Sequence, residues 1–449
     1  MSNANERKTC KHHGGCVRIR VISDLHIHSR FSRATSQQMS IKEIARYAKI
    51  KGLQLVGTGD FTHPLWLKEI RETLVPDSDT DLFKITGNSD FPMHFMLTTE
   101  VCTIFGFQNE TKKVHHVILT PSIDSAVQIN GALAKYGNLS ADGRPTLNMT
   151  APQLVEEVMQ VSGENMIFPA HAWTPWFSVF GAFSGFNSIE DCYQDMTKHI
   201  HALETGLSSD PPMNWRLSKL DRFTLVSNSD SHSFWPWRMG REANVFELDR
   251  VSYKEITEAI RTKDTKRFKF TIETDPAYGK YHWTGHRNCN VSLSPQEARK
   301  RGNICPVCGR KLTEGVEQRV EELADRPATF TAANSPGFMR LLPLSEIIAA
   351  ALNVDSPSTQ AVWKIYNSLV ERFGDEYKVL IDASKEALSQ VVEQQIADAI
   401  TRVREGSATV VPGYDGVYGK LVLTPTATDV PRLKPPRGSV QQLNLADFW

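Results

Sequence analysis

The chain has 449 residues, with 51 lysines and arginines against 51 aspartates and glutamates, so its formal net charge is +0. This length allows two or three domains, and the balanced charge means that any case for nucleic-acid binding must rest on local clusters. No apolar stretch is long enough to span a bilayer and no signal peptide is apparent, so we expect a cytoplasmic protein without a membrane partner. Of the 7 cysteines, the four outside a metal-binding pattern described below, Cys10, Cys16, Cys102 and Cys192, show no disulfide-like spacing, which fits a reducing compartment.

Short apolar runs recur through the first half of the chain, and most of them end in a side chain that binds metals. His26 and His28 follow the run 17–23, Asp60 follows 53–58, Glu100 follows 95–99, His171 follows 166–169, and Asp230 and His232 follow 223–228. A further run, 114–119, carries His115 and His116. Neighbouring residues of a strand point to opposite faces, so only one of these two histidines should be a ligand, and we favour His115. Together the ligands exceed what one ion can use, which predicts a multinuclear centre.

Helix signals lie between the runs. Ser40 with Glu43 forms a capping pattern before an amphipathic stretch that Gly52 ends, and Thr150 with Gln153 repeats the pattern. Strands alternating with helices predict an α/β fold. If the strands are parallel, their carboxyl ends bring the ligands to one face of a β/α barrel.

A second group of ligands follows the barrel. His286 and Cys289, then Cys305 and Cys308, have the spacing of a zinc ribbon. Four protein ligands close a site, so this zinc ion should be structural. His282 is the alternative to His286 as the fourth ligand.

Two kinds of side chain near these sites suit nucleic acid. Basic residues cluster at 261–269 and in the ribbon, where they neutralise phosphates if they share a face and are otherwise solvated surface. Aromatic residues follow both His171 and His232. They are candidates to stack on an extruded base, and the alternative is that they pack the barrel rim.

Beyond the ribbon, apolar residues at helical spacing from about 342 to 405 predict a small helical domain. A tether rich in proline follows, and it ends in a peptide with the spacing of a clamp-binding motif: Gln442, Leu445, Phe448 and Trp449. The predicted partner is a sliding clamp, either PCNA-like or bacterial. The alternative is that this peptide docks on its own protein.

These elements predict an N-terminal extension at 1–16, a catalytic barrel at 17–275, a zinc-binding ribbon at 276–325, a helical domain at 326–420 and a flexible tail at 421–449. Within the extension, residues 10–16 hold two cysteines and two histidines that could trap a metal, although a frayed terminus is the simpler interpretation.

The motifs Asp24-Leu-His-Ile-His28, Thr58-Gly-Asp60 and Ser229-Asp-Ser-His232 resemble those of the polymerase and histidinol phosphatase (PHP) metal-dependent phosphoesterases. This resemblance covers roughly residues 17 to 250. The stretches 57–60, 204–210, 240–244 and 412–419 resemble the endonuclease Q family over nearly the whole chain. The resemblance implies a PHP-type distorted β/α barrel followed by a zinc ribbon and a small helical domain.

The resemblance also implies a ligand scheme. One metal would be held by His26, His28, Glu100 and Asp230, a second by Glu100, His115 and His171, and a third would be served by Asp60 and His232. Phe61 follows Asp60 where many PHP proteins have histidine, so the third site should be weaker or should use His63. The expected catalytic residues are Asp230, His232 and His171. The expected ions are up to three zinc ions in the catalytic cluster and one structural zinc ion, with Mg or Mn as alternatives for activity.

The implied function is cleavage of DNA on the 5′ side of a deaminated base (hypoxanthine, xanthine or uracil) or of an abasic site. A multinuclear metal centre suits phosphodiester hydrolysis, because bridging metals lower the pKa of bound water and neutralise the charge on phosphoryl oxygens. No Gly-x-Ser-x-Gly nucleophile motif is present. The alternative is a PHP-type phosphatase acting on a small phosphoester, which would need neither the ribbon, the helical domain nor the tail.

Overall fold

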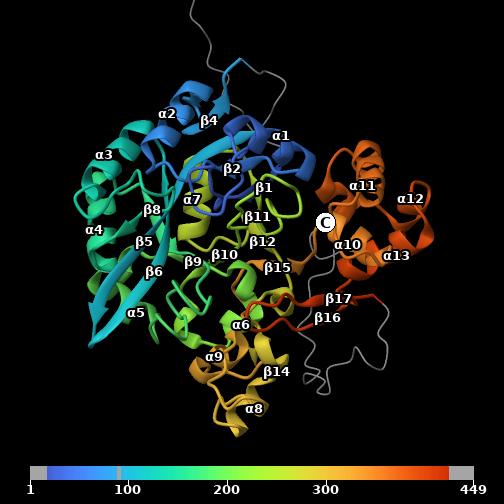
Figure 1. Cartoon of the computed structure of the whole chain (residues 1–449). Helices are drawn as coiled ribbons and strands as arrows, with labels where there is room; N and C mark the ends of the chain where they lie inside the picture. The colour runs from blue at the N-terminus through green and yellow to red at the C-terminus, as the bar shows by residue number, and fades with distance from the viewer. Residues whose placement is uncertain (1–17, 88–92, 424–449) are drawn as a thin grey trace, which may run out of the picture.

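The computed structural model describes residues 18–87 and 93–423, which form a central mixed sheet with helices around it, a small cysteine-containing unit and a group of C-terminal helices (Figure 1). The strands are β1 (Ile19–Asp24), β2 (Leu55–Gly57), β3 (Leu74–Asp77), β4 (Leu82–Ile85), β5 (His94–Phe107), β6 (Glu110–Thr120), β7 (Thr146–Leu147), β8 (Met166–Pro169), β9 (Ala202–Glu204), β10 (Thr224–Val226), β11 (Ala243–Leu248), β12 (Phe268–Glu273), β13 (Thr284–His286), β14 (Val291–Leu293), β15 (Gly337–Arg340), β16 (Thr409–Val411) and β17 (Lys420–Val422). The predicted N-terminal extension and clamp-binding peptide lie outside the described residues.

The helices are α1 (Ile41–Lys51), α2 (Pro64–Thr73), α3 (Ile123–Leu133), α4 (Ala151–Val161), α5 (Ile189–Tyr193), α6 (Pro211–Trp215), α7 (Tyr253–Arg261), α8 (Pro295–Lys300), α9 (Val316–Leu323), α10 (Leu344–Ala351), α11 (Gln360–Phe373), α12 (Lys385–Ser389) and α13 (Gln394–Arg404). Two helices begin where the sequence predicts. Ser40 accepts a hydrogen bond from the Glu43 backbone at the start of α1, and Thr150 and Gln153 form a full capping box at α4. Gly52 ends α1 with a φ of 96°, a conformation that favours glycine.

The strands β1, β2, β5, β6, β8, β9 and β10 follow one another around a distorted barrel. Hydrogen-bonded ladders join β1 to β2, β2 to β5, β5 to β6, β6 to β8 and β9 to β10. The Ala172 amide donates to the Glu204 carbonyl between β8 and β9, and a parallel bridge between Ile27 and Ser231 closes the ring. The predicted α/β class with a distorted barrel is confirmed.

The expectation of parallel strands is wrong for β6, which pairs antiparallel with both β5 and β8. Gln108 and Asn109, with φ values of 48° and 64°, form a two-residue turn that makes β5 and β6 a hairpin. Glu100 on β5 lies opposite Val117, and His115 is two residues from Val117 on β6. Residues two apart in a strand share a face, so Glu100 and His115 still meet.

The C-terminal part departs from the predicted boundaries. β15 pairs in parallel with β12, so residues 337–340 belong to the main sheet and not to the helical domain. A four-residue strand carries too little alternation to be recognised in a sequence. The loop between β16 and β17 returns to the cysteine-containing unit, where the Trp283 amide donates to the Gly413 carbonyl. No helix among the described residues is long and apolar enough to cross a membrane.

Candidate metal centre

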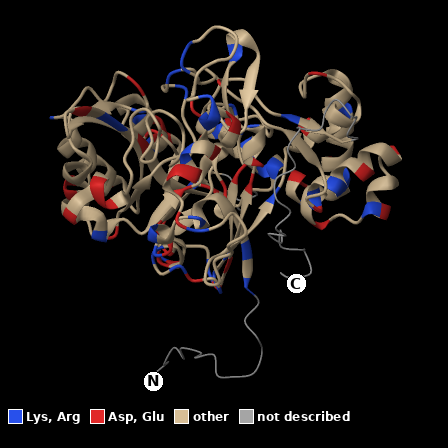
Figure 2. Cartoon of the chain, turned by 90° about the horizontal axis from the view of Figure 1, so that it is seen from below, with Lys and Arg blue, Asp and Glu red and all other residues tan. Residues whose placement is uncertain are grey.

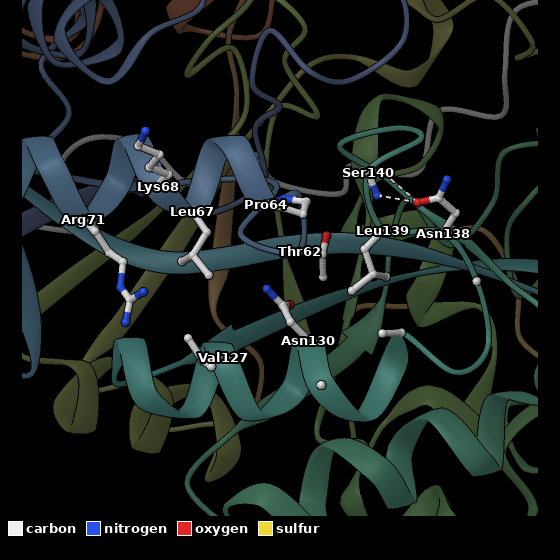
Figure 3. Close-up of a pocket in the computed structure, with 13 residues that line it drawn as sticks. Thr62, Pro64, Leu67, Lys68, Arg71, Val127, Asn130, Asn138, Leu139 and Ser140 are labelled. Carbon is white, nitrogen blue, oxygen red and sulfur yellow. Dashed lines mark hydrogen bonds between the residues drawn. The ribbon is translucent and has the colours of Figure 1, made fainter.

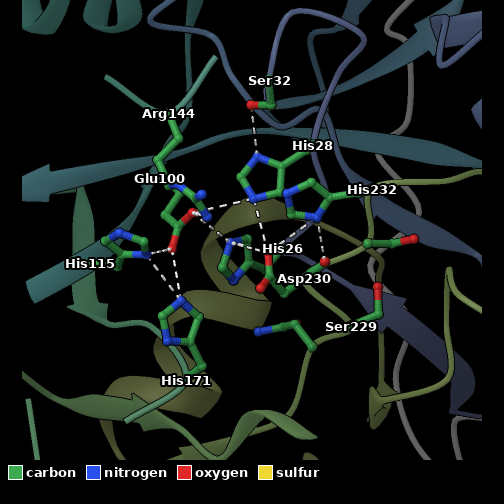
Figure 4. Close-up of polar contacts among 12 residues, drawn as sticks. His26, His28, Ser32, Glu100, His115, Arg144, His171, Ser229, Asp230 and His232 are labelled. Atoms are coloured by element: carbon green, nitrogen blue, oxygen red, sulfur yellow. Dashed lines mark hydrogen bonds and ion pairs between the residues drawn. The ribbon is translucent and has the colours of Figure 1, made fainter. Parts of the chain in front are cut away.

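Two groups of side chains that could hold metal ions meet inside the barrel mouth (Figure 4). In the first group, ligand atoms of His26, His28, Glu100 and Asp230 all lie within 4.8 Å of one another. The histidines follow β1, Glu100 lies within β5, and Asp230 follows β10. His28 Nε2 is 2.9 Å from an Asp230 oxygen and 3.2 Å from Glu100 Oε2.

The second group consists of Glu100, His115 and His171, and it shares Glu100 with the first. Glu100 Oε1 lies 2.9 Å from His115 Nδ1 and 3.1 Å from His171 Nε2. The other oxygen, Oε2, faces His26 and His28. One carboxylate therefore serves both groups, which is the arrangement needed to bridge two ions.

In the first group, the Nδ1 atom of each histidine has a carboxylate partner. His26 Nδ1 lies 3.0 Å from Glu204, and His28 Nδ1 lies 2.9 Å from Asp60. Such carboxylates fix the tautomer and leave Nε2 free to coordinate. His26 Nε2 is buried and has no hydrogen-bond partner, which is costly for a polar atom unless an ion occupies the space it faces. The donor set therefore fits a metal centre.

Electrostatics hold the carboxylates of the centre in their ionised form. Burial alone would raise the pKa of Glu100, but His115, Arg144 and His26 outweigh it and hold that pKa well below its usual range. The pKa of Asp230 is likewise held well below its usual range against burial by the hydrogen bond from His28. Both carboxylates are therefore ionised at neutral pH, the form in which a carboxylate could bind an ion.

The backbone is strained at three residues of this region. Asp60, His171 and Asp230 have φ values of 49°, 28° and 47°, in the left-handed region that residues other than glycine rarely occupy. Strain of this kind gathers at functional sites, where the surrounding structure holds it in place.

The structure brings together six of the predicted ligands and places others apart. Asp60 lies outside both groups, because its Oδ2 accepts from Ser29 and Ser32 while its Oδ1 faces His28. The His232 ring lies 4.4 Å from the His28 ring, centroid to centroid, in a tilted arrangement, and His63 stacks on Phe31. The third metal site formed by Asp60 and His232 stays a prediction.

His116 points away from the centre, as the alternation along β6 requires. Its ring lies between Thr103 Oγ1 at 2.9 Å and Tyr193 OH at 2.8 Å. Burial, with His115 nearby, lowers the pKa of His116 to about 3, so it is neutral. His116 is a structural residue of the barrel wall, and His115 is the one that faces Glu100.

The second predicted metal site also assembles. His286, Cys289, Cys305 and Cys308 have ligand atoms within 4.8 Å of one another, on the hairpin β13–β14 and the turn after α8. Burial would raise the pKa of Cys305, yet the backbone amides of Cys308 and Val307 lower it to about 6, which favours the thiolate. His282 lies instead 3.4 Å from Glu317, outside the group.

The predicted basic cluster at 261–269 is taken up by contacts within the protein. Arg261 donates to backbone carbonyls of residues 163–165, Lys263 donates to Asp221, and Arg267 pairs with Asp264. Figure 2 colours Lys and Arg blue and Asp and Glu red, and the two kinds of position are interspersed along the ribbon, in keeping with the zero net charge. Three of the five basic residues of this cluster therefore make contacts within the protein.

Sequence reasoning missed two residues of the centre, Glu204 and Arg144. Glu204 ends β9, a strand of three residues in which only Ala202 and Leu203 are apolar, so it repeats the pattern of the predicted ligands after a run too short to notice. Arg144 lies in a loop and donates to Glu100 Oε2 at 3.0 Å. No local signal in the sequence marks it.

A separate cavity of about 630 Å³ lies between α2 and α3 (Figure 3). Its lining includes Leu67, Val127 and Leu139, with Lys68 and Arg71 at one end, and contains no histidine, cysteine or carboxylate. It is therefore not a further metal site.

The chain is similar to one protein family and to several known proteins. The family described as "MJ0043 C-terminal domain" matches residues 343–407, most of the C-terminal helices. The uncharacterized protein MJ0043 of Methanocaldococcus jannaschii is 33% identical over 260 residues, which are 57% of this chain and only 32% of that protein's length. The uncharacterized protein YqxK of Bacillus subtilis is 25% identical over 412 residues, covering 90% of this chain and 99% of that protein.

Two solved structures match over nearly the whole length. The lesion-specific endonuclease PfuEndoQ from Pyrococcus furiosus is 34% identical, with a TM-score of 0.80 over 93% of this chain and 100% of that one. Endonuclease Q in complex with a 27-mer duplex substrate carrying an abasic lesion at the active site is 35% identical, with a TM-score of 0.79 over 90% of this chain and 96% of that one. At this identity and coverage, the chain belongs to the endonuclease Q family.

Proposed function

We propose that this chain is a metal-dependent DNA endonuclease that hydrolyses a phosphodiester beside a damaged nucleotide. The observation that carries the proposal is the pair of ligand groups sharing Glu100, in a chain whose family includes a lesion-specific endonuclease and an enzyme solved with abasic DNA. The specific substrates proposed are duplexes with an abasic site, hypoxanthine, xanthine or uracil, cut on the 5′ side.

The division of work within the centre follows from the geometry. Metal ions, when bound, lower the pKa of a water molecule and neutralise charge on the phosphoryl oxygens. Zinc is the proposed ion, because imidazole nitrogens and carboxylates are its usual ligands, with Mg or Mn as alternatives. The chain supplies the ligands and the carboxylates Glu204 and Asp60, which fix the ligand histidines. Asp230, with 31% of its side chain exposed, is the ligand of the first group nearest to an incoming substrate.

Exposed aromatic rings lie in the segment that follows His171 and support the DNA proposal. Trp176 and Phe183 are 40% and 42% exposed and stack on each other at 4.9 Å, with an angle of 13° between their planes. Large exposed rings are candidates to stack on a base that leaves the duplex. The aromatic residues after His232 are less free, because Trp235 and Trp237 pack against Trp363 of α11.

The proposal is tested with 5′-labelled duplexes that carry one abasic site, hypoxanthine, xanthine or uracil, beside an undamaged duplex and a panel of small phosphomonoesters. Each is incubated with metal-depleted protein to which zinc, magnesium or manganese is added back. Cleavage on the 5′ side of the lesion is the expected result. Hydrolysis of a phosphomonoester with every duplex left intact would instead establish the phosphatase.

The peptide that contains Gln442, Leu445, Phe448 and Trp449 lies outside the described residues, and its proposed role rests on the sequence alone. A glutamine, an aliphatic residue three positions on and two adjacent aromatic residues suit a hydrophobic pocket on a sliding clamp. We therefore propose a sliding clamp as the protein partner.

A further inference from the structure

Arg144 is the one arginine that the structure brings to the carboxylate shared by both ligand groups, among the described residues. Its Nη1 donates to Glu100 Oε2 at 3.0 Å, and Figure 4 shows it beside Glu100 on the same side of the centre as His115. Arg144 is not among the predicted metal ligands, and the proposed function assigns it no role in the reaction.

The loop that carries Arg144 is fixed on both sides of it. The Gly143 amide donates to the Phe31 carbonyl, and Thr62 donates to the Gly143 carbonyl. A Cβ on Gly143 would lie 2.2 Å from an Asp60 oxygen, so only glycine allows this approach. On the other side, the Cys102 amide donates to the Pro145 carbonyl, and β7 pairs with β5. Arg144 is therefore held at the centre by a loop that cannot shift without disturbing Asp60 and β5.

The guanidinium group has donors to spare. Within the described residues, only Nη1 donates to the protein, while 25% of the Arg144 side chain is exposed. Burial works against its charge, but Glu100 and Asp230 raise the pKa of Arg144, so it is a permanent cation. Arginine presents several N–H groups in a planar fork that matches the oxygens of a phosphate.

We propose that Arg144 binds the scissile phosphate, donating from its free N–H groups to a non-bridging oxygen and stabilising the charge that gathers there in the transition state. This role rests on the proposed phosphodiester hydrolysis. The water oxygen forms the new bond to phosphorus, and the leaving oxygen departs with the electron pair of the broken bond. One proton of the water ends on the leaving oxygen by way of solvent, and the other is released to solvent. Arg144 keeps its own protons throughout.

A merely structural Arg144 makes a different prediction. If it served only to neutralise Glu100, its loss would alter metal affinity, and saturating metal would restore the rate. If it binds the phosphate, saturating metal cannot restore the rate, because the lost N–H groups donated to a phosphate oxygen of the substrate and not to a metal ligand alone.

The test compares Arg144→Met, Arg144→Lys and Arg144→Ala with wild type on an abasic duplex at saturating metal. The matched control is Arg250→Met, which removes an exposed cation just beyond β11, whose Leu248 pairs with Ile19 at the end of β1 away from the centre. Loss of one preorganised donor is expected to lower kcat about 10²- to 10³-fold in Arg144→Met. Arg144→Lys should fall in between, because a point charge replaces the fork.

Three further readouts accompany the rates. Metal content should match wild type in every variant, the metal-free Arg144→Met protein should bind the abasic duplex more weakly than metal-free wild type, and added guanidinium should partly restore Arg144→Ala. Wild-type rates in Arg144→Met at saturating metal would overturn the role of Arg144 while leaving the proposed function in place. A wild-type protein that cleaves no lesion duplex would overturn both.

Discussion

The ammonium group of Lys51 lies 2.7 Å from a carboxylate oxygen of Glu376, and both side chains are closed to solvent. The contact joins the end of α1 to the C-terminal helices. Lys51 also donates to the Pro236 carbonyl, and Glu376 accepts from Tyr366 OH and from the Leu344 amide. The helical group is thus held to the barrel by a buried, hydrogen-bonded ion pair.

Lys51→Met should destabilise the protein by about 3–5 kcal/mol, because it leaves the Glu376 carboxylate buried without its cation. Lys51→Met combined with Glu376→Gln should recover part of the loss, since the double variant buries no unpaired charge. Denaturant unfolding measures both, with Lys42→Met on the exposed face of α1 as the control. Equal stability of Lys51→Met and the control would contradict the pairing.

Asp230→Asn and His28→Ala should abolish cleavage and lower the metal content of the protein without unfolding it, because each removes a ligand of the first group and leaves the core intact. Asp60→Asn should behave differently. Its carboxylate orients His28, so we expect metal affinity to fall about 10- to 100-fold with no ion lost at saturation. Loss of one whole ion at saturating metal in Asp60→Asn would show that Asp60 is itself a ligand.

Cys305→Ser and Cys308→Ser should each remove one equivalent of zinc and lower the stability of the ribbon, because a closed four-ligand site contributes folding free energy. Elemental analysis and limited proteolysis between residues 280 and 320 measure the two effects. Cys192→Ala, which alters a buried cysteine outside both groups, is the control. Undiminished zinc in the two serine variants would refute the assignment.

Glu273 makes the stability of the barrel depend on pH. Burial, with Asp210 adding to it, raises the pKa of Glu273 to about 8, whereas an unfolded glutamate has its ordinary, lower value. Folding therefore favours the protonated form of Glu273. The stabilisation that this form gives is complete at pH values below the ordinary pKa of a glutamate, and it is lost as the pH rises from that value to about 8. The slope approaches about 1.4 kcal/mol per pH unit.

Glu273→Gln should flatten that dependence and stabilise the protein at pH 8, because the amide is never charged and can still bond to the hydroxyls of Thr205 and Ser227. Thermal unfolding between pH 5 and 8.5 provides the measurement. Glu247→Gln, on the more exposed face of β11, serves as the reference. If the stability of Glu273→Gln varied with pH as that of wild type does, a group other than Glu273 would be responsible for the dependence.

Deletion of residues 440–449 should leave cleavage of a short duplex unchanged, because the peptide contains no ligand of either metal site. Clamp binding should disappear, and Phe448→Ala with Trp449→Ala should reproduce the loss, since truncating an aromatic anchor costs about 2 kcal/mol or more. Calorimetric titration with the sliding clamp of the same organism measures the affinity. Equal affinities for the full and shortened chains would exclude the peptide as the binding element.

The sequence could predict which side chains gather in the two groups because each of them follows or lies within an apolar run, and period-two alternation separates His115 from His116. It could not predict that Asp60 faces His28, because that contact depends on how the turn after β2 packs against the segment after β1. The sequence did not predict Arg144 as a site residue for a related reason, since its position depends on the close approach of Gly143 to Asp60. Contacts between loops depend on tertiary packing, and a local pattern does not contain them.

The closure of the barrel by Ile27 and Ser231 sets an order in which the centre can assemble during synthesis. The second ligand group is complete once the chain reaches His171, whereas the first must wait for Asp230, which is 202 residues beyond His28. A nascent chain that ends before Asp230 therefore lacks one ligand of the group that holds His26 and His28. Acquisition of an ion by the first group would mark the moment at which the two ends of the barrel meet.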